Sequence, residues 1–338
     1  MIHKIISCCA ITTALLLSGC GSSDGESKLE TQQMLDDGDF AGVISKLESN
    51  ANSKEDYIAL ASAYMGKAGF SLSSIIGLVS DNANANGGDE FSSFVNSTSS
   101  RASYKSIGEL SKAGDFYKKV LKNKCDGLSK DLSSGEKDLC VFYGLSKVSQ
   151  TAVTITELSE DTSKLVESGT DDKLAASACA LQYAFNGTTT VGCSVVANPN
   201  VTFTQSNRTY RNVDVTYSGK TFGYLLTTTT PGSTVMTHGQ CKLDDFSTRT
   251  TDVVTISGFY PCPIVESNTT ADLQTGQVLV DALNNGSTSI KAAAPEDVKE
   301  DIDKFLEEVL EANGRSIHDS NTTVTVSDIV KYLDTKNQ

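Results

Sequence analysis

Tryptophan is absent from this sequence of 338 residues, and histidine occurs only three times. A hydrophobic core must therefore be built from Leu, Val, Ile and Ala with a few Tyr and Phe side chains. No long basic run exists, and the formal net charge is −14. Because nucleic acids and anionic lipids carry negative charge themselves, this balance argues against both as partners.

Motifs that bind metals, phosphates or cofactors are missing as well. No Cys-x-x-Cys pair occurs, and only His238 and His318 lie beyond the first 20 residues, which argues against zinc. The sequence contains neither a phosphate-cradling loop nor a dinucleotide fingerprint. Its acidic pairs do not have the spacing of a calcium loop. We therefore predict that the protein holds no metal and no cofactor.

Two short patterns typical of catalytic serines stand in the wrong context. Residues 21–25 match Gly-x-Ser-x-Gly, but neither a strand before them nor a helix after them is predicted. Ser134 to Lys137 match Ser-x-x-Lys and fall in a predicted polar turn. We therefore predict no catalytic residue and a protein that is not an enzyme. The alternative is a hydrolase that uses carboxylates, which sequence alone cannot pair.

The first 20 residues have the layout of an export signal. Lys4 gives a positive start, and Ile5 to Leu17 form an apolar segment too short to span a bilayer as a helix. The following Leu17-Ser18-Gly19-Cys20 resembles the lipobox of bacterial lipoproteins. The resemblance implies cleavage before Cys20 and acylation of its thiol and amino group, and two or three acyl chains hold a membrane firmly. The alternative is an ordinary secretory signal with an incidental cysteine.

The lipoprotein resemblance also implies a location. No aspartate follows Cys20, so the family's signal for retention at the inner membrane is missing. We therefore expect an outer-membrane lipoprotein of the cell envelope that faces the periplasm. No second apolar stretch is long enough to span a bilayer, which makes the lipid anchor the expected membrane attachment.

Six cysteines remain after the expected cleavage and acylation. They are Cys125, Cys140, Cys179, Cys193, Cys241 and Cys262. An even number in an oxidising compartment predicts three disulfides, with metal ligation as the competing interpretation. We predict that sequence neighbours pair, as Cys125–Cys140, Cys179–Cys193 and Cys241–Cys262. Each pair would close a loop of roughly 15 to 20 residues, worth about 3 kcal/mol in the chain-entropy model.

Apolar residues at helical spacing fill the first half of the chain. Gly38-Asp39-Phe40 comes before one such stripe. The next stripe contains Tyr57, Leu60, Ala61 and Tyr64. It resembles the first helix of a tetratricopeptide (TPR) repeat, and a weaker copy begins at Tyr104. The copy holds a second Gly-Asp-Phe triplet at 114–116, and each triplet is expected to lead into a second helix.

The TPR resemblance covers residues 31–125. It implies stacked helical hairpins with a concave surface suited to a peptide, a protein or a small ligand. The alternative is a generic bundle of helical hairpins. Further helices are predicted at 104–124, 139–158 and 171–185.

The composition changes at Asn186, where Thr, Val, Tyr, Gly and Asn become dominant. Alternating patterns predict strands at 201–204, 213–217 and 253–256, and Ser218-Gly219 predicts a turn.

The clearest helix runs from Pro295 to Gly314. Its apolar stripe consists of Val298, Ile302, Phe305, Leu306, Val309 and Leu310. We expect Phe305 in the core and Glu308 on a solvated acidic face. A short strand at 324–326 and a helix at 329–333 are expected to follow.

Asn268 and Asn321 each begin an Asn-x-Thr triplet with an acidic residue two positions upstream. This arrangement resembles the extended acceptor of bacterial N-glycosylation. Both asparagines are therefore candidate modification sites.

These patterns predict a mainly α protein of TPR-like hairpins with an inserted or appended β-rich module, α+β overall. The predicted parts are a signal peptide (1–19), a tether (20–30), a helical body (31–185), a β-rich disulfide-containing module (186–268) and a C-terminal helical segment packing on the body (269–338). The expected function is a non-enzymatic binding or scaffold module for envelope assembly or transport. The alternative is a periplasmic hydrolase with a carboxylate-lined cleft between body and module.

Overall fold

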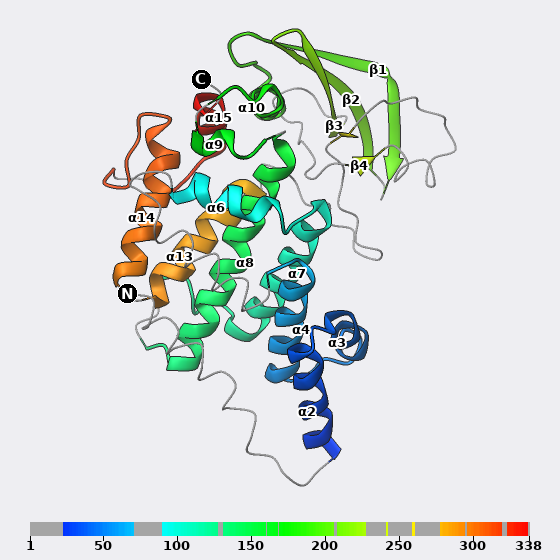
Figure 1. Cartoon of the computed structure of the whole chain (residues 1–338), viewed down its shortest axis with the longest axis vertical. Helices are drawn as coiled ribbons and strands as arrows, with labels where there is room; N and C mark the ends of the chain where they lie inside the picture. The colour runs from blue at the N-terminus through cyan, green and yellow to red at the C-terminus, as the bar shows by residue number, and fades with distance from the viewer. Residues whose placement is uncertain are drawn as a thin grey trace. The chain divides into compact units, whose positions relative to one another are not determined.

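The computed structural model describes most of the chain between residues 23 and 336. The described ranges are 23–70, 90–127, 131–159, 161–167, 169–205, 208–227, 241–242, 259–260, 278–294, 296–319 and 323–336. Most of these residues are helical, and three strands form a small antiparallel sheet (Figure 1). The prediction of a mainly α chain with a smaller β part is confirmed.

The chain divides into two compact units. The first draws on residues 1–85, 109–149 and 285–302, and the second on 86–108, 150–284 and 303–338. Both units therefore combine segments that are far apart in the sequence. The predicted boundaries between body, β-rich module and C-terminal segment stay predictions.

The first unit begins with three short helices that pack on one another (Figure 1). They are α2 (Ser23–Asp36), α3 (Phe40–Leu47) and α4 (Lys54–Lys67). Gly38 turns the chain after α2 with a φ of 78°. The Asp39 side chain then accepts a hydrogen bond of 3.0 Å from the Gly42 amide and caps α3. The first Gly-Asp-Phe triplet thus leads into a helix, as predicted. Because α2 begins at Ser23, part of the predicted tether is helical.

Helix α7 (Tyr104–Leu121) contains the second Gly-Asp-Phe triplet in its interior. The prediction that this triplet leads into a new helix is wrong. A Cβ atom built on Gly114 would lie 2.6 Å from Cε of Lys147 and 3.3 Å from Oγ of Ser146, both on α8. Gly114 therefore gives room to side chains of a neighbouring helix and makes no turn.

Helix α8 (Ser134–Leu158) begins five residues earlier than the predicted start. Ser133 and Glu136 hydrogen-bond each other's backbone amides at its start, so Ser134 to Lys137 form its first turn. Farther along, Gly144 meets Gly286 of α13 (Leu283–Ala293). A Cβ on Gly144 would lie 2.6 Å from the Gly286 carbonyl oxygen. The two helices therefore contact backbone to backbone at this point, which only glycine permits.

The second unit contains the sheet and the helix that supports it. Strands β1 (Cys193–Gln205), β2 (Arg208–Tyr217) and β3 (Lys220–Thr227) pair antiparallel in that order. Ser218 and Gly219 join β2 to β3 with φ values of 50° and 78°, which confirms the predicted turn. A separate pair consists of β4 (Cys241–Lys242) and β5 (Phe259–Tyr260). The strand predicted at 253–256 lies outside the described residues.

Helix α10 (Asp172–Asn186) packs against all three strands of the sheet. Val213, Val215 and Tyr224 are buried on this side. The Tyr224 hydroxyl lies 2.8 Å from Oγ of Ser177 on α10, so its polar end is satisfied inside the core.

Four further helical segments contribute to the second unit. They are α6 (Glu90–Ser99), α9 (Lys164–Glu167), the π-helix η2 (Val278–Ala282) and α15 (Val326–Thr335). Helix α6 contacts α9, and α15 contacts both α10 and η2. The predicted strand at 324–326 is wrong, because Thr325 and Asp328 form a capping box that starts α15.

Helix α14 (Glu296–Glu311) carries the predicted apolar stripe. Phe305, Leu306, Val309 and Leu310 are buried. Gly314 follows with a φ of 67°, and the Arg315 amide donates to the Leu310 carbonyl at 3.0 Å, which closes the helix as predicted.

Candidate functional site

Only some of the predicted site residues fall in the described part of the chain. Cys20, Asn268, Asn321 and Cys262 lie outside it. Acylation of Cys20, glycosylation of the two asparagines and the Cys241–Cys262 pairing therefore stay predictions. Cys125, Cys140, Cys179 and Cys193 form two disulfides, and both match the predicted pairing.

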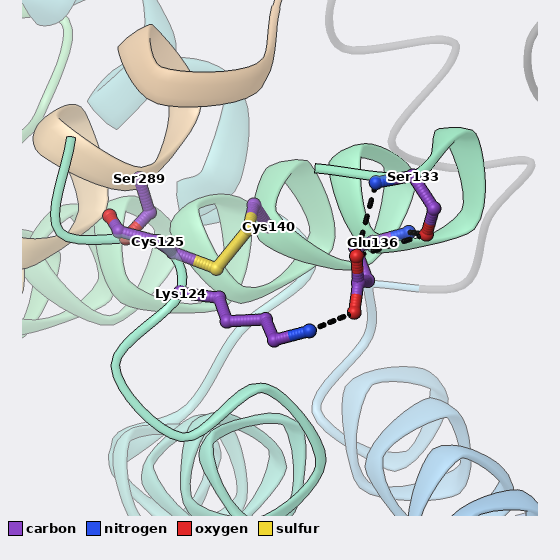
Figure 2. Close-up of a disulfide and its surroundings, with 6 residues drawn as sticks. All are labelled: Lys124, Cys125, Ser133, Glu136, Cys140 and Ser289. Carbon is purple, nitrogen blue, oxygen red and sulfur yellow. Dashed lines mark hydrogen bonds and ion pairs between the residues drawn. A yellow bond between two sulfur atoms is a disulfide. The ribbon is translucent and has the colours of Figure 1, made fainter. Parts of the chain in front are cut away.

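The first disulfide joins Cys125 to Cys140, with Cα atoms 5.5 Å apart. It fastens the chain just after α7 to the first turns of α8, and both residues are buried. From α13, the Ser289 hydroxyl donates to the Cys125 carbonyl at 3.3 Å (Figure 2). Three helical segments of the first unit therefore meet at this disulfide.

An ion pair lies beside the Cys125–Cys140 disulfide on the solvent side. Lys124 binds Glu136, and Glu136 also accepts hydrogen bonds from the amide and hydroxyl of Ser133 at 3.0 and 2.9 Å (Figure 2). The hydrogen bond from Lys124, followed by those from Ser133, lowers the pKa of Glu136 to about 2. The Glu136 carboxylate is thus occupied by the helix cap and by Lys124. This argues against a catalytic role for the Ser-x-x-Lys pattern that contains it.

The second disulfide joins Cys179 of α10 to Cys193, the first residue of β1, with Cα atoms 6.5 Å apart. An ion pair of 2.8 Å between Lys220 and Asp172 links the same helix to β3. The sheet is therefore attached to α10 covalently at one end and by polar contacts elsewhere. These contacts make α10 and the sheet one piece of the second unit.

A groove of the first unit is a candidate for binding. It encloses about 390 Å³, and we call it the α2–α4 groove. Its walls are Ser27, Lys28, Thr31, Gln32 and Leu35 of α2, Leu47 of α3, Asn52 and Ser53 of the next loop, and Glu55, Asp56 and Ala59 of α4. No sequence pattern indicated this site, although the capping box Ser53-x-x-Asp56 is a visible marker of the α4 start.

The lining of the α2–α4 groove suits a polar, extended ligand. Lys28 provides a positive charge and Glu55 a negative one, and both are exposed. Gln32 and Asn52 provide side-chain amides, which offer donor and acceptor together, as a peptide backbone does. Part of the lining is fixed, because Asp56 accepts from the Ser53 amide at 3.1 Å and holds the start of α4. Such a site can bind, but it presents no nucleophile activated by a base.

An aromatic cluster of the first unit lies between α4 and α7; we call it the Phe116 cluster. The Phe116 ring stacks on Tyr57 and Tyr64, with ring centroids 6.1 and 5.8 Å apart. The Tyr64 hydroxyl donates to Glu48 at 2.6 Å, and Lys112 donates to the same carboxylate at 3.1 Å. Burial would raise the pKa of Glu48, but these hydrogen bonds outweigh it and hold the pKa below its ordinary value. The cluster is a packed contact between α4 and α7.

The second unit contains a buried polar group around Glu308 of α14, which we call the Glu308 cluster. The carboxylate accepts from the hydroxyl of Ser92 on α6 and pairs with Lys336 at 3.0 Å. The Ser92 and Tyr332 hydroxyl oxygens are 3.0 Å apart, and both residues are fully buried. Only 8% of the Glu308 side chain is exposed. The prediction that Glu308 lies on a solvated face is wrong, because α6 and α15 supply polar partners on that side.

Within the described ranges, no group of three His, Cys, Asp or Glu residues could hold a metal ion. In the same part of the chain, no helix combines the length and the apolar character needed to cross a bilayer. The carboxylate hydrolase stays a prediction that no contact described above supports.

Comparison with known proteins finds no matching family model, no matching curated protein and no matching solved structure.

Proposed function

We propose that this protein is an exported, lipid-anchored binding module that holds an extended segment of a protein partner in the α2–α4 groove. The groove is the observation that carries the proposal. It is lined by both charges and by two side-chain amides, and it begins at Ser27, seven positions after Cys20. A partner bound there would be kept close to the membrane that holds the anchor.

The arrangement of the first three helices supports a TPR-like architecture for the proposed binding module. Helices α2 and α3 form a hairpin across Gly38 and Asp39, and α4 packs on both. TPR-like proteins stack such hairpins so that neighbouring helices line a binding surface. The chemistry of the groove favours a polypeptide over a small apolar ligand, because eight of its eleven lining residues are polar or charged.

The anchor is tested by replacing the proposed lipidation site. Cys20→Ser removes the thiol that would carry an acyl chain, so the variant should take up no labelled palmitate and should leave the membrane fraction. The wild-type protein should be labelled and stay with outer membranes after density separation. A Cys20→Ser protein that is still labelled and still sediments with membranes would show that the lipobox assignment is wrong.

The groove is tested with a photo-cross-linking residue at position 32 in whole cells. Position 33 is the matched control, because Gln33 is the next residue of α2, is exposed and does not line the groove. We expect one discrete cross-linked product from position 32 and none from position 33. Identical products from both positions would count against binding in the groove.

A charge reversal then separates groove binding from a general electrostatic effect. Lys28→Glu changes the charge of the groove wall, whereas Lys54→Glu makes the same change on an exposed residue outside the lining. Only Lys28→Glu should reduce the cross-link from position 32. Equal loss in both variants would point to long-range charge and not to the groove.

A further inference from the structure

The two disulfides share a simple connectivity. Cys125 pairs with Cys140 and Cys179 with Cys193, so each cysteine is joined to its immediate neighbour among the four. Each bond also closes inside one compact unit, the first in the first unit and the second in the second. Neither bond therefore requires distant parts of the chain to have met before it forms.

Chain entropy favours this connectivity even without folded structure. The native pairs are 15 and 14 positions apart, whereas the competing pair Cys140–Cys179 spans 39 positions. If the probability of loop closure falls as the −3/2 power of loop length, the native pairs form about four times as readily as that competitor. An unfolded chain that meets an oxidant therefore reaches the native pairing in most molecules.

Burial fixes the order of oxidation and folding. Cys140 is completely buried and Cys125 is 6% exposed, whereas Cys193, the partner of the buried Cys179, is partly exposed. Thiol–disulfide exchange requires in-line attack at sulfur, so an oxidant must reach Cys125 or Cys140 before the surrounding helices pack. Oxidation of the Cys125–Cys140 pair must consequently come before the last stage of folding.

From connectivity and burial we infer a place in a reaction sequence: this chain is the substrate of a thiol oxidase that acts before folding is complete. The described pairs need no disulfide isomerase. The inference rests on one part of the proposed function, export to an oxidising compartment. The oxidant is a protein of the dithiol–disulfide class, which donates a disulfide and is itself reduced.

The exchange balances for each pair. The thiolate of Cys125 attacks one sulfur of the oxidant's disulfide, and a mixed disulfide forms while the other oxidant sulfur leaves as a thiolate. The thiolate of Cys140 then attacks the Cys125 sulfur, which forms Cys125–Cys140 and releases the second oxidant sulfur. Two thiols of this chain are oxidised and one disulfide of the oxidant is reduced. The two protons lost by the cysteines end on the oxidant's dithiol.

The pairing is tested with the full mature chain, extracted in detergent, reduced and unfolded in urea. One reaction receives a purified dithiol–disulfide oxidase alone, and a parallel reaction also receives a disulfide isomerase with reduced glutathione. Non-reducing peptide mapping measures the fraction of molecules with both native pairs. A fourfold preference at each pair leaves about 60% correct after oxidation alone, so the isomerase should raise the yield by less than about twofold. A gain of twofold or more would overturn the inference.

The order of events is tested by changing when the oxidant is added. The reduced chain is first returned to native buffer, its folding is followed by circular dichroism, and the oxidase is added afterwards. A reduced chain that folds should be oxidised at Cys125 and Cys140 at least about tenfold more slowly than the unfolded chain, because buried thiols are reached only by unfolding. A reduced chain that stays unfolded also supports the order, since folding then requires the bonds. Equal rates from a folded reduced chain would contradict it.

A cellular experiment separates this inference from the proposed function. In cells that lack the thiol oxidase, thiol alkylation should trap Cys125 and Cys179 in the reduced state, while cells that lack only the isomerase should show native pairs. Palmitate labelling is measured in the same cultures. Native pairing without palmitate labelling would contradict the lipid anchor and leave the oxidation route intact. Palmitate labelling together with reduced cysteines in normal cells would contradict the oxidation route and leave the lipid anchor intact.

Discussion

The tripeptide Gly-Asp-Phe occurs twice in the first unit and has a different structure each time. At 38–40 it ends one helix and starts another, with Gly38 at a φ of 78° and Asp39 as the cap of α3. At 114–116 it continues a single helix, and Gly114 faces Ser146 and Lys147 of α8. Identical local sequence therefore gives a turn in one place and a close helix contact in the other.

The difference teaches that glycine has two separate uses in this chain. Gly38 is needed for its backbone conformation, because no described atom lies within 4 Å of a Cβ built there. Gly114 has helical backbone and instead leaves room for the end of the flexible Lys147 side chain. The same substitution can be made at the matching position of each triplet, and comparing the two variants tests this distinction directly.

The largest effect is expected at the phenylalanines. Phe116→Ala removes a ring that is 9% exposed and stacked between two tyrosines, and we expect a loss of about 3–4 kcal/mol in the free energy of unfolding. Phe40→Ala removes a half-buried ring packed near Gly66 and should cost about half as much. Denaturant unfolding with the disulfides intact measures both. A larger loss for Phe40→Ala would show that the first triplet holds the core.

The glycines should respond with opposite signs. Gly38→Ala forces an alanine into left-handed backbone and should cost about 1–2 kcal/mol. Gly114→Ala should stabilise by up to about 1 kcal/mol through helix propensity, reduced by the displacement of the flexible Lys147 end. Thermal melts under identical buffer compare the two. Equal destabilisation would mean that the contact with α8 cannot adjust.

The aspartates should differ by a smaller amount. Asp39→Ala removes the side chain that caps α3 and should cost about 1 kcal/mol. Asp115→Ala replaces an exposed residue in the interior of α7 and should change stability by less than about 0.5 kcal/mol. Chemical denaturation resolves this difference, and an Asp115 loss as large as that of Asp39 would contradict the capping assignment.

The smallest effect is expected in the pH dependence of the stability that the Phe116 cluster contributes. Burial, together with the hydrogen bond to Glu48, raises the pKa of Tyr64 to about 12. The folded state holds the Tyr64 proton more tightly than the unfolded state. The stabilisation that this gives is complete below about pH 10 and is lost as the pH rises towards 12. Tyr64→Phe should therefore show a smaller loss of melting temperature between about pH 9 and pH 11 than the wild type. Parallel losses in both proteins would assign the alkaline effect to other groups.

Features set by neighbours in the sequence could be predicted. The helix predicted at 171–185, the turn at Ser218-Gly219 and the stripe of α14 each depend on residues within a few positions of one another, and each is confirmed. The same holds for the two disulfides, because loop closure favours nearby cysteines. These features follow from backbone conformation, helical periodicity and short loops, all of which the sequence determines by itself.

Only the tertiary structure decided the remainder. Lys147, 33 positions later, comes against Gly114 inside α7, and Glu308 is buried where Ser92, 216 positions earlier, donates to it. The α2–α4 groove likewise exists only where α2 and the start of α4 pack beside each other. A carboxylate on a helix looks solvated in sequence because its charge favours water. It can be buried once other segments supply donors and a lysine to replace that water, and no local pattern records where those segments come from.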